Sequence, residues 1–163
     1  MNAGATLDLD GNSQTVGNFS STGTLPGTGG TVTNSSTTTL TFTVDQTTGQ
    51  DWAGQITSAD ASHQLNFVKT GNTQLTFRDN NSYFGTTTVQ GNILALVDQG
   101  RLSNTTAISV TNSVLKWDDS GIQGMDSNSA TPRASAPCRS PSTGARSAMS
   151  AAAAPMASFR WAT

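Results

Sequence analysis

The chain has 163 residues, a net charge of −2 and only 11% charged residues, a size that fits one compact domain. Glu is absent and Lys occurs twice, whereas Thr occurs 27 times and Ser 20 times. This composition disfavours a helical protein and favours many short β-strands. The few basic residues before position 125 are spread apart, which excludes a phosphate-binding stripe, so we expect no nucleic-acid partner.

Targeting and redox signals are sparse. No apolar run is long enough to span a bilayer, so we expect no direct membrane insertion of this segment. Residues 1–9 lack the basic and apolar regions of a signal peptide. The protein is therefore either cytosolic or exported by a signal that lies upstream of this chain. The single Cys138 excludes an intrachain disulfide and a multi-cysteine zinc site.

Apolar residues recur at every second position in short bursts, and each burst predicts a strand with one buried face. In chain order the bursts are Leu7 and Leu9; Leu40, Phe42 and Val44; Leu65 and Phe67; Leu75 and Phe77; Leu94 and Leu96; Leu115 and Trp117. Clusters of Gly, Asn and Asp between them predict turns. With about eleven strand candidates at this spacing, the pattern is typical of a β-sandwich, a β-barrel or a β-solenoid, and periodicity alone does not choose among them.

Residues 65–96 carry a more specific pattern. Lys69, Thr70 and Gly71 form a turn signal, an alternating strand with Leu75 and Phe77 follows, and Asn81, Tyr83 and Gly85 mark a corner before Thr86, Thr88, Val89, Leu94 and Leu96. This order resembles the autotransporter-associated β-strand repeat. Residues 6–17 are similar to the segment that follows such a repeat. The chain departs from the family pattern at Thr73, Phe84 and Asn92, of which Asn92 is the mildest because Asn tolerates a left-handed turn.

The resemblance implies a right-handed parallel β-helix in the secreted passenger of a bacterial autotransporter. The physics of such a fold fits the composition, because stacked coils place like side chains in rows about 4.8 Å apart and stacked charges would repel. With three strands in each coil, the predicted strands make roughly three to four coils. Since residues 6–9 resemble the end of a repeat unit, we expect further coils upstream and a longer parent chain as the partner of this segment.

The composition changes near residue 125. Residues 1–124 form the predicted β-helical segment, whereas residues 125–163 contain eleven Ala, eight Ser, four Pro and four Arg but no Val, Ile or Leu. A segment with so few apolar side chains cannot offset the entropy of ordering, which predicts a disordered tail. Ala, Arg, Pro and Ser are also the residues that GC-rich codons yield out of frame, so a frameshift near residue 130 is the alternative.

Candidate catalytic residues are few. His63 is the only histidine and Asp60 is its sole nearby acid, which favours an exposed loop residue over a base or a metal ligand. Asp8 and Asp10 alternate on one strand face and resemble the carboxylate pair of a glycoside hydrolase. If Leu7 and Leu9 point inward, however, the two aspartates simply face water, and we favour this interpretation.

Candidate ligand sites are equally sparse. The run from Gly27 to Gly30 lacks the aspartate of a calcium-binding repeat and the lysine of a phosphate loop, which predicts a turn, no metal and no cofactor. Tyr83, Phe84, Trp52 and Trp117 offer sugar-stacking faces only if they point outward.

Three functions remain. We favour a non-enzymatic structural or adhesive β-helical segment of a secreted or surface-displayed bacterial protein, which would meet surface glycans or neighbouring cells through residues that the sequence does not identify. The first alternative is a polysaccharide-active β-helix enzyme, for which Asp8, Asp10, Arg78 and Lys116 would be the essential groups. The second is a carbohydrate-binding β-sandwich module that binds sugar through Tyr83 or Trp52.

Overall fold

The described part of the molecule consists of β-strands joined by turns. The computed structural model describes residues 1–118, in which there are fourteen strands and no helix. Alternation predicts about eleven strands. The strands that it misses include β9 (Asn80–Asn81) and β12 (Arg101–Leu102), which are too short to show a period. The predicted tail over 125–163 and its boundary lie outside the described residues.

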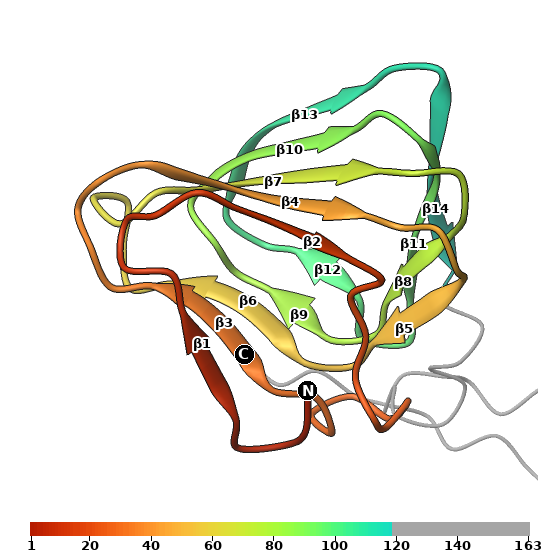
Figure 1. Cartoon of the computed structure of the whole chain (residues 1–163), viewed down its shortest axis with the longest axis horizontal. Coiled ribbons are helices and arrows are strands. Elements are labelled where there is room, and N and C mark those ends of the chain that lie inside the picture. Colours follow the sequence, from red (N-terminus) through yellow and green to blue (C-terminus); the bar gives the residue numbers. More distant parts are fainter. Residues whose placement is uncertain (119–163) are drawn as a thin grey trace, which may run out of the picture. The chain divides into compact units, whose positions relative to one another are not determined.

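The strands form three faces around a common interior (Figure 1). The first face contains β1 (Thr6–Asp8), β3 (Thr31–Asn34) and β6 (Gln55–Ser58), and a bridge from Thr57 to Ser82 links it to β9 and β12. The second face contains β2 (Gln14–Gly17), β4 (Leu40–Asp45), β7 (Leu65–Thr70), β10 (Gly85–Val89) and β13 (Thr105–Val110). The third face contains β5 (Gln50–Trp52), β8 (Leu75–Phe77), β11 (Asn92–Val97) and β14 (Ser113–Asp118).

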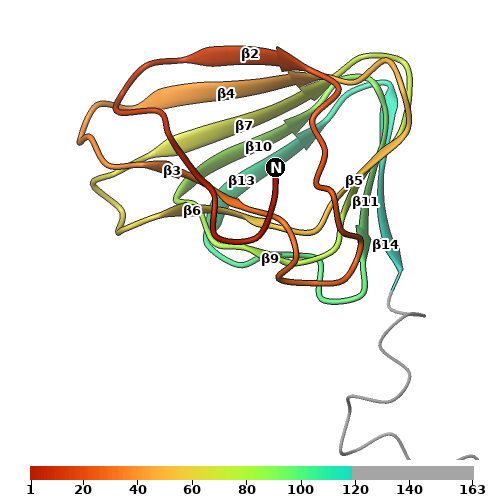
Figure 2. The same ribbon diagram turned by 60° about the horizontal axis from the view of Figure 1, so that its bottom comes forward.

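Within residues 1–118 every paired strand is parallel to its neighbour. The chain visits the faces in turn and returns to the first one coil further along, as the turned view in Figure 2 shows. This arrangement is a parallel β-solenoid, which confirms the predicted fold class and excludes the β-sandwich. The second face has one strand in each of five coils, so the count of three to four coils was too low.

Coil length varies along the chain. In register, Leu40 pairs with Leu65, 25 residues later, whereas Phe67 pairs with Thr87, 20 residues later. The first coil lacks a strand on the third face, where residues 18–30 run along β5 through the hydrogen bond from the Ser21 amide to the Asp51 carbonyl. Repeat length therefore varies too much for a fixed period to reveal the register.

Alternation along each strand produces the core. In β4 and β7 every second side chain is buried, and Leu40, Phe42 and Val44 stack on Leu65, Phe67 and Lys69. Aromatic rings continue this contact between the faces, with ring centroids 5.2 Å apart for Phe67 and Phe77. Such ring pairs stabilise beyond their buried area by about 0.5–1.5 kcal/mol. Inward rows of like side chains therefore hold successive coils in register.

Left-handed turn residues close the corners. Asn92 has φ of 53° and opens β11, which confirms that Asn can fill this position. Its side-chain amide donates to the Asn72 carbonyl of the coil before, at 2.9 Å. At Gly71, φ is 82° and an added Cβ would lie 2.2 Å from the Gln46 carbonyl oxygen. The corner between the second and third faces therefore requires glycine at this position.

Buried amides satisfy the backbone where coils bend. The Asn34 side chain is fully buried, accepts from the Gly11 amide and donates to the carbonyls of Thr38 and Gln64. Gln46 accepts from the Phe19 amide and donates to the Thr48 carbonyl. These bonds replace the ladder at the bends, because a buried backbone group without a partner would cost free energy.

Candidate functional site

Asp8 and Asp10 lie at the open edge of the first coil. Both side chains are exposed, and Leu9 between them is buried, which confirms that the aspartates face water. The Asp8 carboxylate accepts the amides of Asp10 and Ser35, and hydrogen bonds from Ser35 and Asp10 hold the pKa of Asp8 below its usual value. A lowered pKa does not suit the general acid of a glycosidase, and the two accepted amides make Asp8 a cap of this turn.

His63 and Asp60 form a local pair in the loop between β6 and β7. Their Nδ1 and Oδ1 atoms are 2.8 Å apart, and Ser62 Oγ lies 3.1 Å from the same Nδ1. The hydrogen bonds from Ser62 and His63 lower the pKa of Asp60 to about 2. A serine triad binds its acid and its nucleophile on opposite ring nitrogens, whereas here both meet Nδ1. The cluster is therefore a turn in a loop, as predicted, although His63 itself is half-buried rather than exposed.

Three charged residues that are far apart in the sequence meet on the third face. Arg78 Nη2 lies 3.1 Å from Asp51 Oδ2, and Arg78 Nη1 lies 2.7 Å from Asp98 Oδ2. Burial alone would lower the pKa of Arg78, but the bonds and charges of Asp98 and Asp51 outweigh it and raise that pKa. We call Asp51, Arg78 and Asp98 the ion ladder. It ties three successive coils together and balances the arginine charge.

A polar groove of about 410 Å³ lies beside the ion ladder. Its lining comes from the loop over the first coil and from two strands of the third face: Ser21, Thr24, Gly49, Gln50, Asp51, Gln74 and Thr76. The Gln74 amide donates to the Thr76 hydroxyl at 3.0 Å, which orients both side chains. Amides, hydroxyls and a carboxylate are the groups that bind sugar hydroxyls, so the groove is suited to a polar, uncharged ligand.

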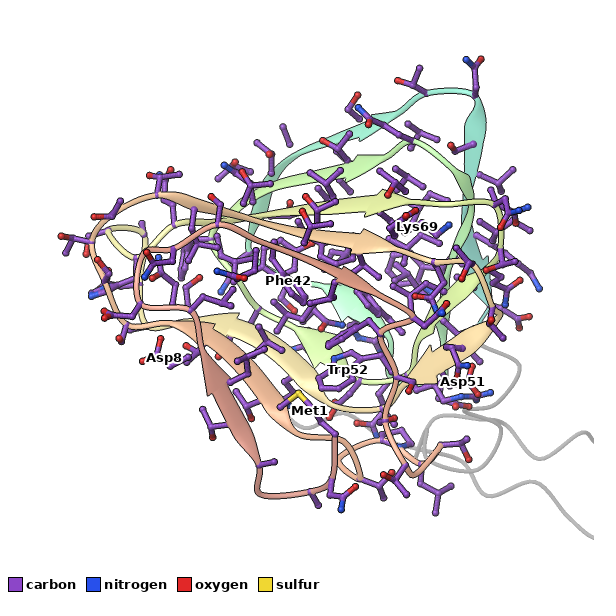
Figure 3. The ribbon with its side chains drawn as sticks, viewed as in Figure 1. Met1, Asp8, Phe42, Asp51, Trp52 and Lys69 are labelled. Atoms are coloured by element: carbon purple, nitrogen blue, oxygen red, sulfur yellow. The ribbon has the colours of Figure 1, made fainter. Side chains whose placement is uncertain are left out.

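The sequence missed this groove and the ion ladder. Asp51 and Asp98 carry no local signal, because each belongs to a different coil from Arg78. Only the register places them together, since Asp51 pairs with Thr76 and Leu96 pairs with Phe77. In Figure 3, Asp51 lies at the rim of the ring of strands, whereas Phe42, Trp52 and Lys69 point into it.

Lys69 is an unexpected member of the core. Its side chain is buried in the inward row between Val44 and Val89, and its ammonium donates to the carbonyls of Gly71, Thr73 and Gly91. Desolvation lowers the pKa of Lys69, an effect that the nearby charge of Asp45 opposes. The ammonium thus joins two successive corners from inside the solenoid and is inaccessible to a substrate.

The aromatic candidates divide by position. Trp52 and Tyr83 are buried, and the Tyr83 hydroxyl lies 2.5 Å from Thr87 Oγ1. Burial raises the pKa of Tyr83. Neither ring can stack on a sugar, so the binding role considered for them was wrong. Trp117 is 64% exposed, but it belongs to an inward row at the last coil.

The glycine run meets an aspartate that the sequence did not connect with it. Gly27, Gly29 and Gly30 line a hollow of about 230 Å³ together with Gly54 and Asp79. Gly29, Gly30 and Gly54 are required by packing, since a Cβ at Gly54 would lie 2.1 Å from the Gly30 carbonyl oxygen. Within residues 1–118, no three His, Cys, Asp or Glu side chains gather closely enough to hold a metal ion. Asp79 alone supplies a carboxylate there.

Two further findings complete the description. Among the described residues, no helix is long and apolar enough to cross a membrane. No protein-family model, curated protein or solved structure matches the chain. The described geometry offers a parallel solenoid scaffold and a polar groove beside the ion ladder.

Proposed function

We propose that the chain is a structural and adhesive β-helical segment of a secreted or surface-displayed bacterial protein of the autotransporter passenger type, and that it has no catalytic activity. The observation that carries this proposal is the unbroken parallel register from β2 to β13. A solenoid whose coils share a core transmits position along its axis, which suits a stalk or a binding surface. The resemblance of residues 65–96 to the autotransporter-associated repeat supports the surface location.

The disposition of the charged groups supports the absence of catalysis. Asp8 caps a turn, Asp60 pairs with His63, and Asp51 and Asp98 share Arg78. Each of these carboxylates thus has a structural partner, whereas a hydrolase or lyase needs an acid and a base that converge on a substrate.

The polar groove is the proposed contact with surface glycans. Gln50 begins β5 and Gln74 directly precedes β8, and Asp51 of the ion ladder adds a carboxylate to the same lining. Amide and carboxylate groups that lie side by side can bind adjacent sugar hydroxyls. The groove has no exposed aromatic ring in its lining, so we expect weak binding that many repeated copies on a surface would strengthen.

A glycan array with the full chain tests this proposal. Binding should be lost when Gln50 and Gln74 are both changed to Ala, and it should persist in the control Gln90→Ala, an exposed amide outside the groove. Binding that survives the double substitution would contradict the groove assignment. Release of reducing ends from any arrayed polysaccharide, abolished by Asp51→Asn, would favour the enzyme instead.

A further inference from the structure

The last coil exposes side chains that belong to the interior. Ile108, Val110 and Trp117 are 47%, 43% and 64% exposed. In the coil before, the partners of Val110 and Trp117 are Val89 and Leu96, which are 0% and 1% exposed. The three residues are exposed because within residues 1–118 no coil follows to cover them. A contiguous apolar face of this kind is typical of a binding surface.

Backbone groups are open at the same place. β13 and β14 are the outer strands of the second and third faces, and β1 and β2 are the outer strands at the opposite end. An outer strand presents a row of unpaired amide and carbonyl groups, which favours pairing with another strand. All of these strands run in the same parallel sense, so the two ends are related by translation along the axis.

The two ends also match side chain by side chain. We define the three end rows as the inward rows that contain Leu7, Val16 and Trp52. The first row begins with Leu7 and finishes with Leu102. The second begins with Val16 and finishes with Val110. In the third, Phe19 stacks on Trp52 with ring centroids 4.1 Å apart, and the row finishes with Trp117.

We propose that the last coil of one molecule binds the first coil of a second copy, head to tail, with β13 pairing in parallel with the β2 of that copy. Leu102, Val110 and Trp117 then lie under the copy's Leu7, Val16 and Phe19, which repeats the contact that already joins successive coils. Because the contact joins two different surfaces, it is heterologous and builds linear oligomers.

The outward side chains accommodate this contact. Continuing the same register places Thr15 of the copy over Ser109, and Asp8 of the copy over Ser103, so these positions do not oppose like charges. In the second face, the same register places one polar side chain, Gln14 of the copy, over an apolar one, Ile108. The hydroxyl rows outside the solenoid continue across the junction.

A second copy fits the last coil better than other occupants. A two-fold arrangement of two last coils would reverse the strand direction and would lose the in-register rows. Residues 125–163 contain no Val, Ile or Leu with which to continue the aliphatic rows. Within residues 1–118, the first coil offers strands of the right direction with matching row ends. The inference goes beyond the proposed function and does not depend on glycan binding.

Two complementary blocked variants of the full chain test the proposal. Val110→Lys places a charge on the last coil, and Val16→Lys places one on the first coil. Sedimentation velocity should show that the wild type grows beyond 16.8 kDa with concentration, and that each variant alone stays monomeric. An equimolar mixture of the two should form a dimer and stop there, because only one open pair of ends remains.

Controls keep the test falsifiable. Thr88→Lys adds the same charge to the outer side of a middle strand and should leave assembly unchanged. Val110→Thr and Val16→Thr keep the branched shape and should weaken assembly in the same direction if the lysine variants fail to fold. A monomeric wild type at all concentrations, self-association of Val16→Lys alone, or loss of assembly in Thr88→Lys would each overturn the proposal.

Discussion

The middle coils and the last coil contain the same kinds of residue in the same rows but differ in burial. Leu96 in β11 is 1% exposed, whereas its partner Trp117 in β14 is 64% exposed. Neither strand pattern distinguishes the two positions. The difference teaches that a neighbouring coil, rather than the residue itself, creates the core of a solenoid. Stability is then a sum of coil and interface terms, and the ends contribute least.

The first coil is better covered than the last. Phe19 is 7% exposed and stacks on Trp52, and the Met1 side chain packs against the same core. The Met1 amino group donates to the Ser20 carbonyl at 2.8 Å, and the Thr22 amide donates to the Met1 carbonyl. Figure 3 shows Met1 close to Trp52 at this end. Among residues 1–118, the first coil and its loop leave Leu7 and Leu25 exposed, whereas the last coil exposes Ile108, Val110 and Trp117 of the inward rows.

The largest expected difference in the free energy of unfolding is between a substitution in a middle coil and one in the last coil. Phe67→Ala removes a fully buried ring that contacts Phe42, Phe77 and Tyr83, and it should cost about 3–5 kcal/mol of the free energy of unfolding. Trp117→Ala should change that free energy by no more than about 0.5 kcal/mol. Urea denaturation monitored by circular dichroism measures both. Equal losses would show that the last coil is covered in solution.

Glycine substitutions give the next effect. In Gly71→Ala the new Cβ would collide with the Gln46 backbone at a left-handed φ of 82°, which should cost roughly 1–2 kcal/mol for the conformation and about 1–3 kcal/mol for the overlap. Gly27→Ala is the control from the first coil, with φ of 80° and no atom within 4 Å. Its free energy of unfolding should fall only by the cost of the left-handed conformation. If thermal melts give the two variants the same loss of stability, the close approach of successive coils is not the reason for glycine at position 71.

The ion ladder predicts a smaller, salt-dependent effect. Arg78→Met leaves Asp51 and Asp98 without their shared partner and should lower the free energy of unfolding by about 1 kcal/mol at low salt. High salt should reduce this difference, because screening weakens the ion pairs in the wild type. Lys116→Met in the last coil removes an exposed pair with Asp118 and should have no measurable effect. A loss that does not depend on salt would mean that Arg78 stabilises by packing.

The smallest effect concerns pH and lies in a loop outside the stacked strands. The pKa of Asp60 falls from 3.8 to about 2 on folding, so its contribution is present above pH 3.8 and is lost as pH falls through 2. Between these values the wild type should lose slightly more stability than Asp60→Asn. Acid titration of the melting temperature measures the difference. Parallel curves for the two proteins would show that the contact with His63 does not persist in solution.

The sequence predicted the fold because alternation and turn chemistry are local. Phe42 and Phe67 each lie in a burst with period two, and Asn92 fits a left-handed turn. The rows between coils were not predictable, since the offset between partners ranges from 19 residues for Leu75 and Leu94 to 28 for Gln14 and Phe42.

The polar sites were harder to predict than the fold. Lys69 resembles a surface turn residue in sequence, yet its place in an alternating strand puts it inside, where three carbonyls stabilise it. Asp51, Arg78 and Asp98 meet only through the register. The turn at His63 was predicted correctly, because its partners Asp60 and Ser62 are close in sequence, whereas the bond from the Ser35 amide to Asp8 spans 27 residues and was missed.

Disulfide trapping tests the central claim, in-register parallel stacking, most directly. In a Cys138→Ser background, Thr43→Cys with Val68→Cys joins two outward positions that pair directly between β4 and β7, about 4.8 Å apart and within reach of a disulfide. Thr43→Cys with Thr70→Cys is offset by two residues on the same face and lies beyond the limit of about 7 Å. We expect mass spectrometry after mild oxidation to find complete cross-linking in the first pair and little in the second. Equal cross-linking, or preference for the offset pair, would contradict the account.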